Sequence, residues 1–285
     1  MIQFANPTAD LFVPDDTESG QAFGRTTHLG VGAHQDDLEV MALHGILACY
    51  KQPQKWFGGV TVTNGAGSSR TNEYADYTDE QMQAVRAEEQ RKAAVVGEFG
   101  FVAQLGYPSS TVKQPGYSDF AVDLRMILAA TKPEVVYTHN LADKHDTHVA
   151  VVVPLIRALR EMPAAERPVE VYGVEVWRDL NWLLDDEKVL LDMANRPNLV
   201  RALISIFDSQ ISGGKRYDLA LEGRLRSNAT FFDSHAVDDM TLASYAMDLK
   251  PLVDEPSLDI VKYVDGYVER FREDVRSRVS RFTGD

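Results

Sequence analysis

Residues 27–39 of this 285-residue chain read THLGVGAHQDDLE, a short apolar run that leads directly into a helical pattern opening on two acids. Runs of this kind, bounded by glycine or polar residues, are typical of buried strands. Four more follow, with helical patterns between them; we predict strands at 27–32, 58–63, 102–105, 135–138 and 169–176, and helices at 38–50, 80–99, 120–130 and 149–161. Strand and helix therefore alternate along the first part of the chain.

This alternation predicts an α/β fold with a Rossmann-like, mostly parallel sheet and helices on both faces. After residue 176 the pattern becomes mainly helical, at 198–212, 215–231 and 259–282. We interpret residues 1–285 as a single domain, with a polar N-terminal arm, an α/β core over 1–178 and a mainly helical C-terminal extension over 179–285. The last helix carries an apolar stripe, which predicts packing on its own domain or, alternatively, a homo-oligomer interface.

The composition excludes several classes of protein. There are 43 acidic and 29 basic residues, a net charge of −14, so the average surface repels nucleic acid and anionic lipid. The single cysteine allows no internal disulfide and no cysteine-based metal cage. No apolar run approaches the roughly 18 residues that a membrane span needs, and no secretory signal pattern opens the chain. We expect a cytoplasmic protein without membrane insertion, whose metal ligands are nitrogen and oxygen.

Two segments combine histidine with carboxylate at the ends of predicted strands. His34 and Asp37 are three residues apart where the first strand meets its helix, and His145 and His148 repeat that spacing after the strand at 135–138. If these strands lie close together, His34, Asp37 and His148 can form an open site with zinc at about 2.0–2.2 Å. Asp36 and His145 are then left for proton transfer.

Each segment taken alone has a simpler interpretation. An Asp-Asp pair at a helix start most often caps the helix, because carboxylates accept the free amide hydrogens there. A histidine pair three residues apart most often lies on a solvated helix face. Their combination at two strand ends of an α/β pattern favours a metal site.

The order of the motifs over residues 27–178 resembles the PIG-L/LmbE-like family of zinc-dependent N-deacetylases. The resemblance rests on six stretches: AHQDDLE at 33–39, a glycine-rich loop within 60–69, RAEE at 86–89 with Ala93, LGYP at 105–108, KPEVVYTH at 132–139 and HDTH at 145–148. Members of that family act on N-acetylglucosamine-containing compounds.

The resemblance implies zinc ligands at His34, Asp37 and His148, and a general base at Asp36. It implies that His145 stabilises the oxyanion or protonates the leaving amine. The chain departs from the family pattern at three positions: Gln35 replaces a proline, Thr147 replaces an aspartate, and Phe207 stands where a histidine usually precedes Ser-Gln. The partner that orients His145 is therefore open between Asp143, Asp146 and another residue.

Residues outside the two segments add candidate substrate contacts. Arg86 is a candidate substrate-binding residue, although surface ion pairing is an equal alternative. Trp177 and Trp182 are either a stacking surface for a sugar or core residues. A late cluster of cations contacts either a substrate anion or neighbouring acids; it comprises Lys215, Arg216, Arg224 and Arg226.

We predict a zinc-dependent hydrolase that deacetylates a small N-acetylated amino-sugar substrate, with Zn²⁺ as cofactor. Within the enzyme class, the alternative is an amidase of a larger acyl or thiol-conjugate amide. A catalytically silent sugar- or metal-binding member is a second alternative. A dinucleotide-binding oxidoreductase is disfavoured, because Gln35 fills the third glycine position of a G-x-G-x-x-G motif.

Overall fold

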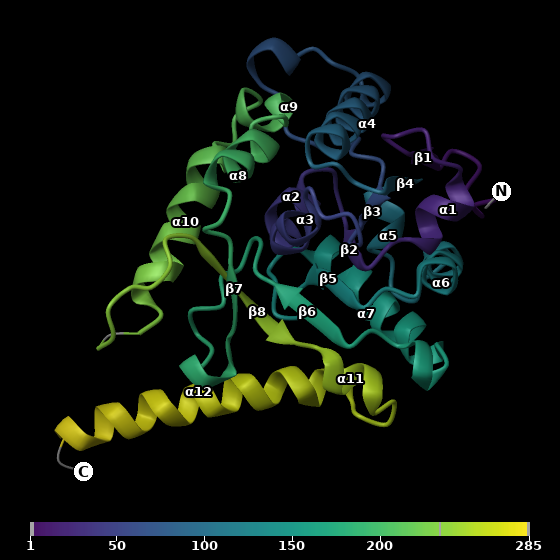
Figure 1. Cartoon of the computed structure of the whole chain (residues 1–285). Helices are drawn as coiled ribbons and strands as arrows, with labels where there is room; N and C mark the ends of the chain where they lie inside the picture. Colours follow the sequence, from purple (N-terminus) through teal and green to yellow (C-terminus); the bar gives the residue numbers. More distant parts are fainter. Residues whose placement is uncertain (1–2, 234, 284–285) are drawn as a thin grey trace.

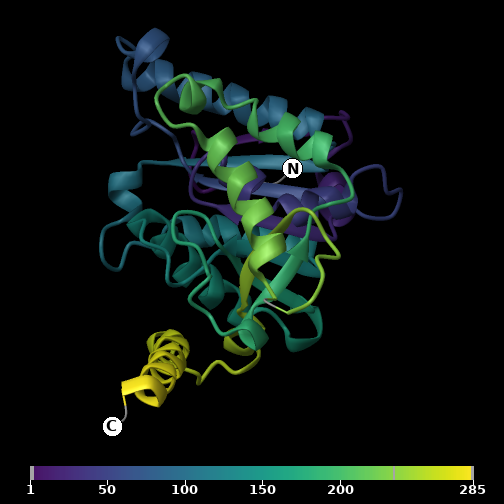
Figure 2. The ribbon, with the colours of Figure 1, turned by 90° about the vertical axis from the view of Figure 1, so that its left-hand side faces the viewer.

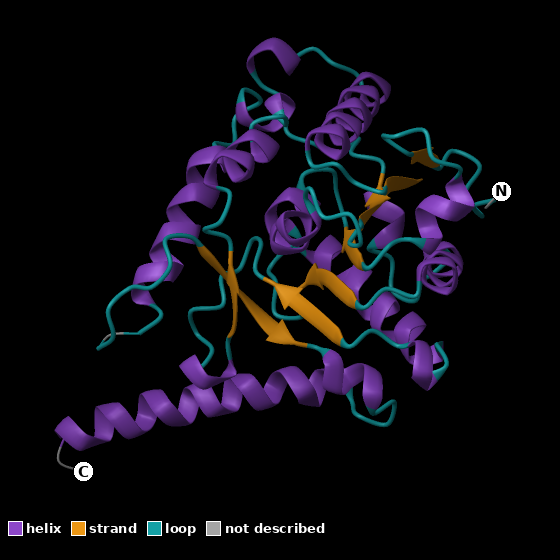
Figure 3. Cartoon of the chain, viewed as in Figure 1, coloured by secondary structure: helices purple, strands orange, loops and turns teal. Residues whose placement is uncertain are grey.

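A computed structural model of the chain describes residues 3–233 and 235–283. It shows one eight-stranded sheet in the order β1-β4-β3-β2-β5-β6-β8-β7, with helices on both faces (Figures 1 and 3). The strands are β1 Asp10–Phe12, β2 His28–Gly32, β3 Phe57–Thr63, β4 Phe101–Tyr107, β5 Val135–His139, β6 Glu170–Val174, β7 Val189–Asp192 and β8 Ala243–Asp248. The predicted α/β class with a mostly parallel sheet is confirmed.

The five central strands, β4-β3-β2-β5-β6, are parallel. At one edge β1 pairs antiparallel with β4, and at the other side β8 pairs antiparallel with both β6 and the edge strand β7. From β2 the chain builds outward through β3 and β4, then crosses back to β5 and continues outward through β6. Because the direction of construction reverses between β2 and β5, a crevice forms at the carboxyl ends of these two strands. That crevice is where an open α/β sheet offers a ligand site.

The helices form two layers, each packed over its own apolar core. Side chains of α1, α6, α7 and α11 cover one face, and side chains of α2, α3, α8 and α10 cover the other. The helices are α1 Ser19–Gly24, α2 Asp37–Met41, α3 Leu43–Cys49, α4 Asp79–Val96, α5 Ser109–Val112, α6 Phe120–Thr131, α7 Asp146–Glu161, α8 Pro197–Ile204, α9 Asp208–Ile211, α10 Tyr217–Phe231, α11 Lys250–Asp254 and α12 Ile260–Thr283. The central strands are buried on both faces, as continuous apolar runs require.

Four sequence-based assignments need correction. The N-terminal arm contributes β1, which pairs with β4, and the segment after residue 178 contributes β7 and β8 to the same sheet. The helix predicted at 38–50 is interrupted at Ala42, which ends α2 and caps α3. The helix predicted at 198–212 consists of α8 and α9, separated at residues 205–207. Short strands and one-residue interruptions leave too little periodicity for sequence patterns to detect them.

The last helix, α12, runs along the lower edge of the molecule in Figure 1 and projects away from the sheet in Figure 2. Its first turns pack through Tyr263 and Tyr267, and the Tyr263 hydroxyl donates to the Asp248 carbonyl. Most of the predicted stripe is exposed, from Val261 to Phe282. Among the described residues, no helix combines the length and apolarity of a membrane span.

Candidate metal centre

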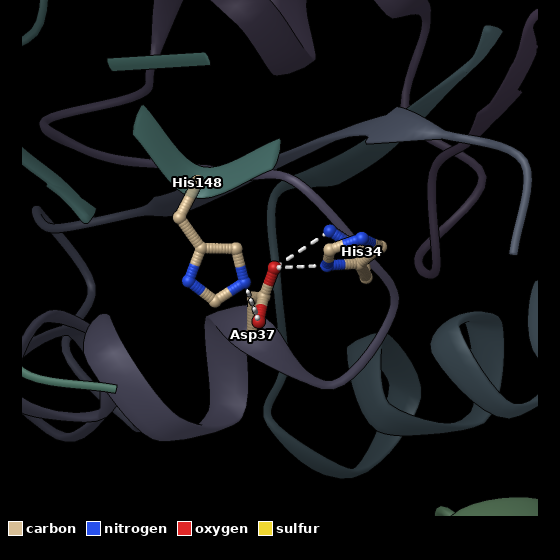
Figure 4. A group of neighbouring side chains, drawn as sticks. All are labelled: His34, Asp37 and His148. Atoms are coloured by element: carbon tan, nitrogen blue, oxygen red, sulfur yellow. Dashed lines mark hydrogen bonds and ion pairs between the residues drawn. The ribbon is translucent and has the colours of Figure 1, made fainter. Parts of the chain in front are cut away.

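Three side chains from the carboxyl ends of β2 and β5 face one another in the crevice (Figure 4). Asp37 Oδ2 lies 3.2 Å from His34 Nδ1, and Asp37 Oδ1 lies 3.5 Å from His148 Nε2. His34 and Asp37 come from the turn between β2 and α2, whereas His148 lies in the first turn of α7. The structure therefore brings together the three residues that the sequence suggested as metal ligands.

The turn after β2 is unusual because Asp36 has a φ of 84°. This left-handed conformation costs energy for any residue other than glycine, and surrounding contacts must hold it. The Asp36 amide donates to Gln90 Oε1 at 3.2 Å, and the Arg86 guanidinium donates to the Gln35 carbonyl. Asp36 precedes α2, yet its side chain makes no capping hydrogen bond, so capping does not account for this carboxylate.

The close approach of Asp37 to the strand depends on Gly32. A Cβ at Gly32 would lie 2.9 Å from the Asp37 Cβ, which is too close for two carbon atoms. The bare backbone of Gly32 therefore makes room for Asp37 beneath the end of β2. The Asp37 carboxylate in turn accepts the His34 amide at 2.6 Å, which closes the turn.

These residues fit a metal ion. The ligand atoms of His34, Asp37 and His148 all lie within 4.8 Å of one another. Two atoms on one tetrahedral ion at about 2.1 Å are roughly 3.4 Å apart, close to the two spacings measured here. His148 Nε2 is buried without a hydrogen-bond partner among the described residues, and a metal would satisfy it.

The protonation states also suit a metal. Burial disfavours the Asp37 carboxylate, but His148 and His139 beside it outweigh burial and hold its pKa well below the ordinary value. Burial, together with His139, lowers the pKa of His148 to about 4. Near neutral pH the site therefore offers one anion and a neutral imidazole, which are the ligand forms that a divalent cation requires.

Asp143 orients His148. Its Oδ2 lies 3.0 Å from His148 Nδ1, and its carboxylate also accepts the backbone amides of Trp177 and Arg178 at 3.3 and 3.1 Å. A proton on Nδ1 leaves Nε2 free to bind a metal, and the carboxylate increases the basicity of the ring. The sequence placed Asp143 among the candidates for orienting His145. In the structure its carboxylate contacts the ring of His148, and it accepts from His145 only through the backbone amide, at 3.4 Å.

His145 lacks the orienting partner that the sequence left open. Its ring lies 5.0 Å from the His34 ring and 4.5 Å from the His148 ring. Among the described residues, its buried Nδ1 has no hydrogen-bond partner, and Asp146 is exposed. Burial lowers the pKa of His145 below its ordinary value, which favours the neutral ring.

His139 is a member of the cluster to which the sequence analysis gave no function. It is fully buried at the end of β5, with Nε2 3.0 Å from the Ala33 amide and 3.3 Å from Asp37 Oδ2. Its ring stacks on His148 at 3.7 Å. Its place at the carboxyl end of a strand beside β2 was the available signal. His139 thus supports both Asp37 and His148 from behind.

Asp36 lies beside the three candidate ligands, next to Arg86. Arg86 is buried rather than ion-paired at the surface, and its guanidinium is 3.3 Å from Asp36 Oδ1. Burial raises the pKa of Asp36 to about 6, although Arg86 opposes that rise. A carboxyl with such a pKa can accept a proton near neutral pH and return it.

Phe207, the departure from the late family segment, packs against Arg86. The Arg86 guanidinium carbon lies 5.8 Å from the centre of the Phe207 ring. The neighbouring Ser209 donates its amide and its hydroxyl to the Glu89 carboxylate, at 2.7 and 2.6 Å. Glu89 thereby attaches α9 to α4 and keeps Phe207 behind Arg86.

Part of the cluster, His34, Asp36, Asp37 and His145, lines a cavity of about 790 Å³, a size that suits a small molecule. Trp177 lines this cavity with its ring 6.0 Å from His145, whereas Trp182 packs against Phe271. Four further kinds of group line it: aliphatic side chains of α2 and α10, hydroxyls, loop glycines and several cations.

The late cluster of cations divides between the cavity and the surface. Lys215 and Arg224 line the cavity. Arg216 pairs with Asp218 at 2.7 Å, and Arg226 pairs with Glu222 at 2.8 Å. Arg216 and Arg226 thus contact neighbouring acids, whereas contact of Lys215 and Arg224 with a substrate anion stays a prediction.

Residues 29–159 match the family model described as PIG-L, GlcNAc-PI de-N-acetylase. This region contains β2 to β5 and α7, and therefore all three candidate metal ligands, Asp36 and His145. No curated protein matches the whole sequence closely enough to be reported as a relative.

Solved structures share the fold at low sequence identity. N,N'-diacetylchitobiose deacetylase from Pyrococcus horikoshii has a TM-score of 0.61 at 15% identity, over 82% of this chain and 86% of its own. The 4-carboxy-2-hydroxymuconate hydratase GalB from Pseudomonas putida KT2440 has a TM-score of 0.59 at 17% identity, over 79% and 95%. The zinc-inhibited form of teicoplanin deacetylase Orf2 has a TM-score of 0.53 at 14% identity, over 78% and 97%.

Proposed function

We propose that this protein is a zinc-dependent N-deacetylase acting on an N-acetylglucosamine-type substrate, because residues 29–159 match the PIG-L family model. One observation carries the proposal. His34 and Asp37 line the cavity, the ligand atom of the buried His148 lies within 4.8 Å of theirs, and a buried carboxylic acid of shifted pKa, Asp36, lines the cavity beside them. This is the arrangement that metal-assisted amide hydrolysis requires.

Zinc suits the two imidazoles and one carboxylate, which leave at least one coordination position open. When bound, zinc would polarise the amide carbonyl and lower the pKa of a coordinated water. The contact between Asp143 and His148 Nδ1 keeps His148 Nε2 available for the ion. His139 and Gly32 keep Asp37 in place on the other side.

Asp36 is the proposed general base. Its carboxylate accepts a proton from the attacking water, and Arg86 holds the carboxylate in position from the side. The raised pKa makes Asp36 a better base than an exposed aspartate, and it lets the same group release the proton near neutral pH. Asp36 then passes this proton to the leaving amine, so it acts both in the attack of water and in the release of the amine.

His145 is the proposed second catalytic group. Its ring lines the cavity close to His34 and His148, so it can donate a hydrogen bond to the oxygen of the tetrahedral adduct. A neutral ring suffices for this donation, in agreement with the lowered pKa. Trp177, beside His145, provides an aromatic face on which a sugar ring can stack.

The test is a screen of N-acetylated amino sugars for acetate and free amine, with the metal content of the purified protein measured in parallel. We expect acetate release that a chelator abolishes and one equivalent of zinc restores. N-propionyl and thiol-conjugate amides of the same sugars form the second arm, because an amidase of larger acyl groups would prefer them. Ligand binding without any amine product, in protein loaded with zinc, would contradict the enzyme assignment.

A further inference from the structure

The cavity carries positive charge that the proposed chemistry does not use. Five cationic residues line it: Arg86, Lys113, Lys144, Lys215 and Arg224. Arg86 is engaged by Asp36 and the Gln35 carbonyl, and Arg224 donates to the Val176 carbonyl. Within residues 3–233 and 235–283, the three lysines have no carboxylate partner in ion-pair distance.

The absence of partners is notable in a chain with a net charge of −14. Of the seven lysines outside the cavity, five lie next to an acid, whereas Lys55 and Lys262 have no carboxylate in ion-pair distance among the described residues. The five are Lys51, Lys92, Lys132, Lys188 and Lys250. In the part of the chain that the structure describes, the only acids lining the cavity are Asp36 and Asp37, which are buried and held by Arg86 and by histidines. The exposed part of the cavity wall is therefore cationic.

The three lysines come from separate parts of the chain. Lys113 directly follows α5, Lys144 lies in the loop after β5, and Lys215 precedes α10. The fold brings them to one cavity, where the hydroxyls of Ser68, Ser69 and Ser109 also line the wall. Hydroxyls and ammonium groups together form the donor set that carboxylates and phosphates bind.

Two of the three lysines lie near His145 or near Trp177, the aromatic residue beside it. Lys144 is the sequence neighbour of His145, so the two side chains leave the same loop. Lys215 Nζ lies 5.3 Å from the centre of the Trp177 ring, which is itself 6.0 Å from the His145 ring. An anionic group bound by Lys215 would thus lie on one side of the Trp177 ring, with His145 and the scissile amide on the other.

We propose that Lys113, Lys144 and Lys215 form an anion subsite for a carboxylate or phosphate that the substrate carries away from its scissile amide. The inference rests on the proposed function for its catalytic consequence, and it narrows the substrate to anionic N-acetylated amino sugars. Because the three lysines are exposed, the attraction is screened by salt.

Binding is tested first, without turnover. Calorimetric titration of the zinc-loaded protein with inorganic phosphate compares the wild type with K113Q/K144Q/K215Q and with the control K51Q/K92Q/K132Q, whose lysines lie outside the cavity. We expect the cavity variant to bind phosphate roughly tenfold more weakly and the control to match the wild type. Equal binding by all three proteins would overturn the subsite, because phosphate would then be bound by zinc alone.

Turnover provides the second measurement. The ratio of kcat/KM for N-acetylglucosamine 6-phosphate to that for N-acetylglucosamine tests a phosphate, and the ratio for N-acetylmuramic acid tests a carboxylate. We expect one of these ratios to exceed tenfold at low salt, and to fall both in the cavity variant and in 0.5 M NaCl. Two ratios near one, with the neutral sugar deacetylated, would reject the subsite while leaving the proposed function intact. Phosphate binding that depends on the lysines, with no amine product, would support the subsite and reject the function.

Discussion

The two ends of the parallel sheet both contain buried histidines, but only one end resembles a reactive site. At the amino end, His28 Nδ1 lies 2.9 Å from the Thr27 hydroxyl and His44 Nδ1 lies 2.8 Å from the Tyr137 hydroxyl. Burial lowers the pKa of both histidines, to about 4 for His28. At the carboxyl end, four histidines surround the carboxylates of Asp37 and Asp143.

Buried carboxylates, and not histidines, distinguish the carboxyl end of the sheet from the amino end. A hydroxyl satisfies a neutral histidine and leaves it as a core residue. A buried carboxylate attracts cations and fixes the tautomer of its neighbours, so the same side chain becomes a candidate ligand. The topology explains the location, because the carboxyl ends of β2 and β5 flank the reversal in strand order.

We expect the largest effect from removing the central carboxylate at the carboxyl end of the sheet. Asp37→Ala deletes the group that His34, His139 and His148 share. We expect zinc content to fall below one tenth of an equivalent and turnover to fall by at least about 10³-fold. Elemental analysis and an acetate assay measure the two effects. A fully active, zinc-loaded variant would remove Asp37 from the ligand set.

Asp36→Asn tests the proposed general base independently of the candidate metal ligands. The amide keeps the size of the side chain but cannot accept a proton, so turnover should fall by about 10²–10⁴-fold with zinc retained. Parallel measurement of zinc and kcat distinguishes this outcome from the loss of zinc expected for Asp37→Ala. Loss of zinc in Asp36→Asn would show instead that Asp36 takes part in metal binding.

Asp143→Asn tests whether the contact between Asp143 and His148 contributes to metal affinity. Without a charged acceptor for the Nδ1 proton, zinc affinity should fall by about 10–100-fold. A competitive chelator titration measures the change, with Asp146→Asn as the matched control on an exposed neighbour. If both variants lose affinity equally, the contact between Asp143 and His148 does not tune the metal.

His28→Gln probes the amino end, where we expect the smallest effect on turnover. The folded-state pKa of His28, about 4, lies below the ordinary value of 6.5. The unfolded chain therefore binds the proton first, and stability present above pH 6.5 is lost as the pH falls towards 4. Between pH 7 and pH 5 this loss is about 2 kcal/mol in the wild type, and the variant should lack it. Urea unfolding at the two pH values measures the difference, and zinc content should stay unchanged.

Much of the core was predictable from local patterns. The five parallel strands are continuous apolar runs, and each observed strand overlaps its predicted range. β7 and β8 escaped prediction because they are short and derive their stability from pairing with each other and with β6, contacts between residues far apart in the sequence. The interruption of the helix at Ala42 likewise has no glycine or proline to mark it.

The candidate site was likewise only partly predictable from the sequence. The sequence suggested His34, Asp37 and His148 because their types and spacings suit a metal. It did not assign Asp143 to His148, since a pairing five residues apart depends on how the loop after β5 folds. It also left Arg86 open between the surface and the site, because burial of an arginine depends on what packs over it, here Phe207.

The sequence by itself determined the alternation of strands and helices, the acidic surface and the identity of the nitrogen and oxygen donors, because these follow from local composition and periodicity. Only the tertiary structure decided which carboxylate serves which histidine, and that three unpaired lysines from distant segments share one cavity. The physical reason is that hydrogen bonds and electrostatic fields act over a few ångströms in space, and the chain crossover from β4 to β5 sets those distances.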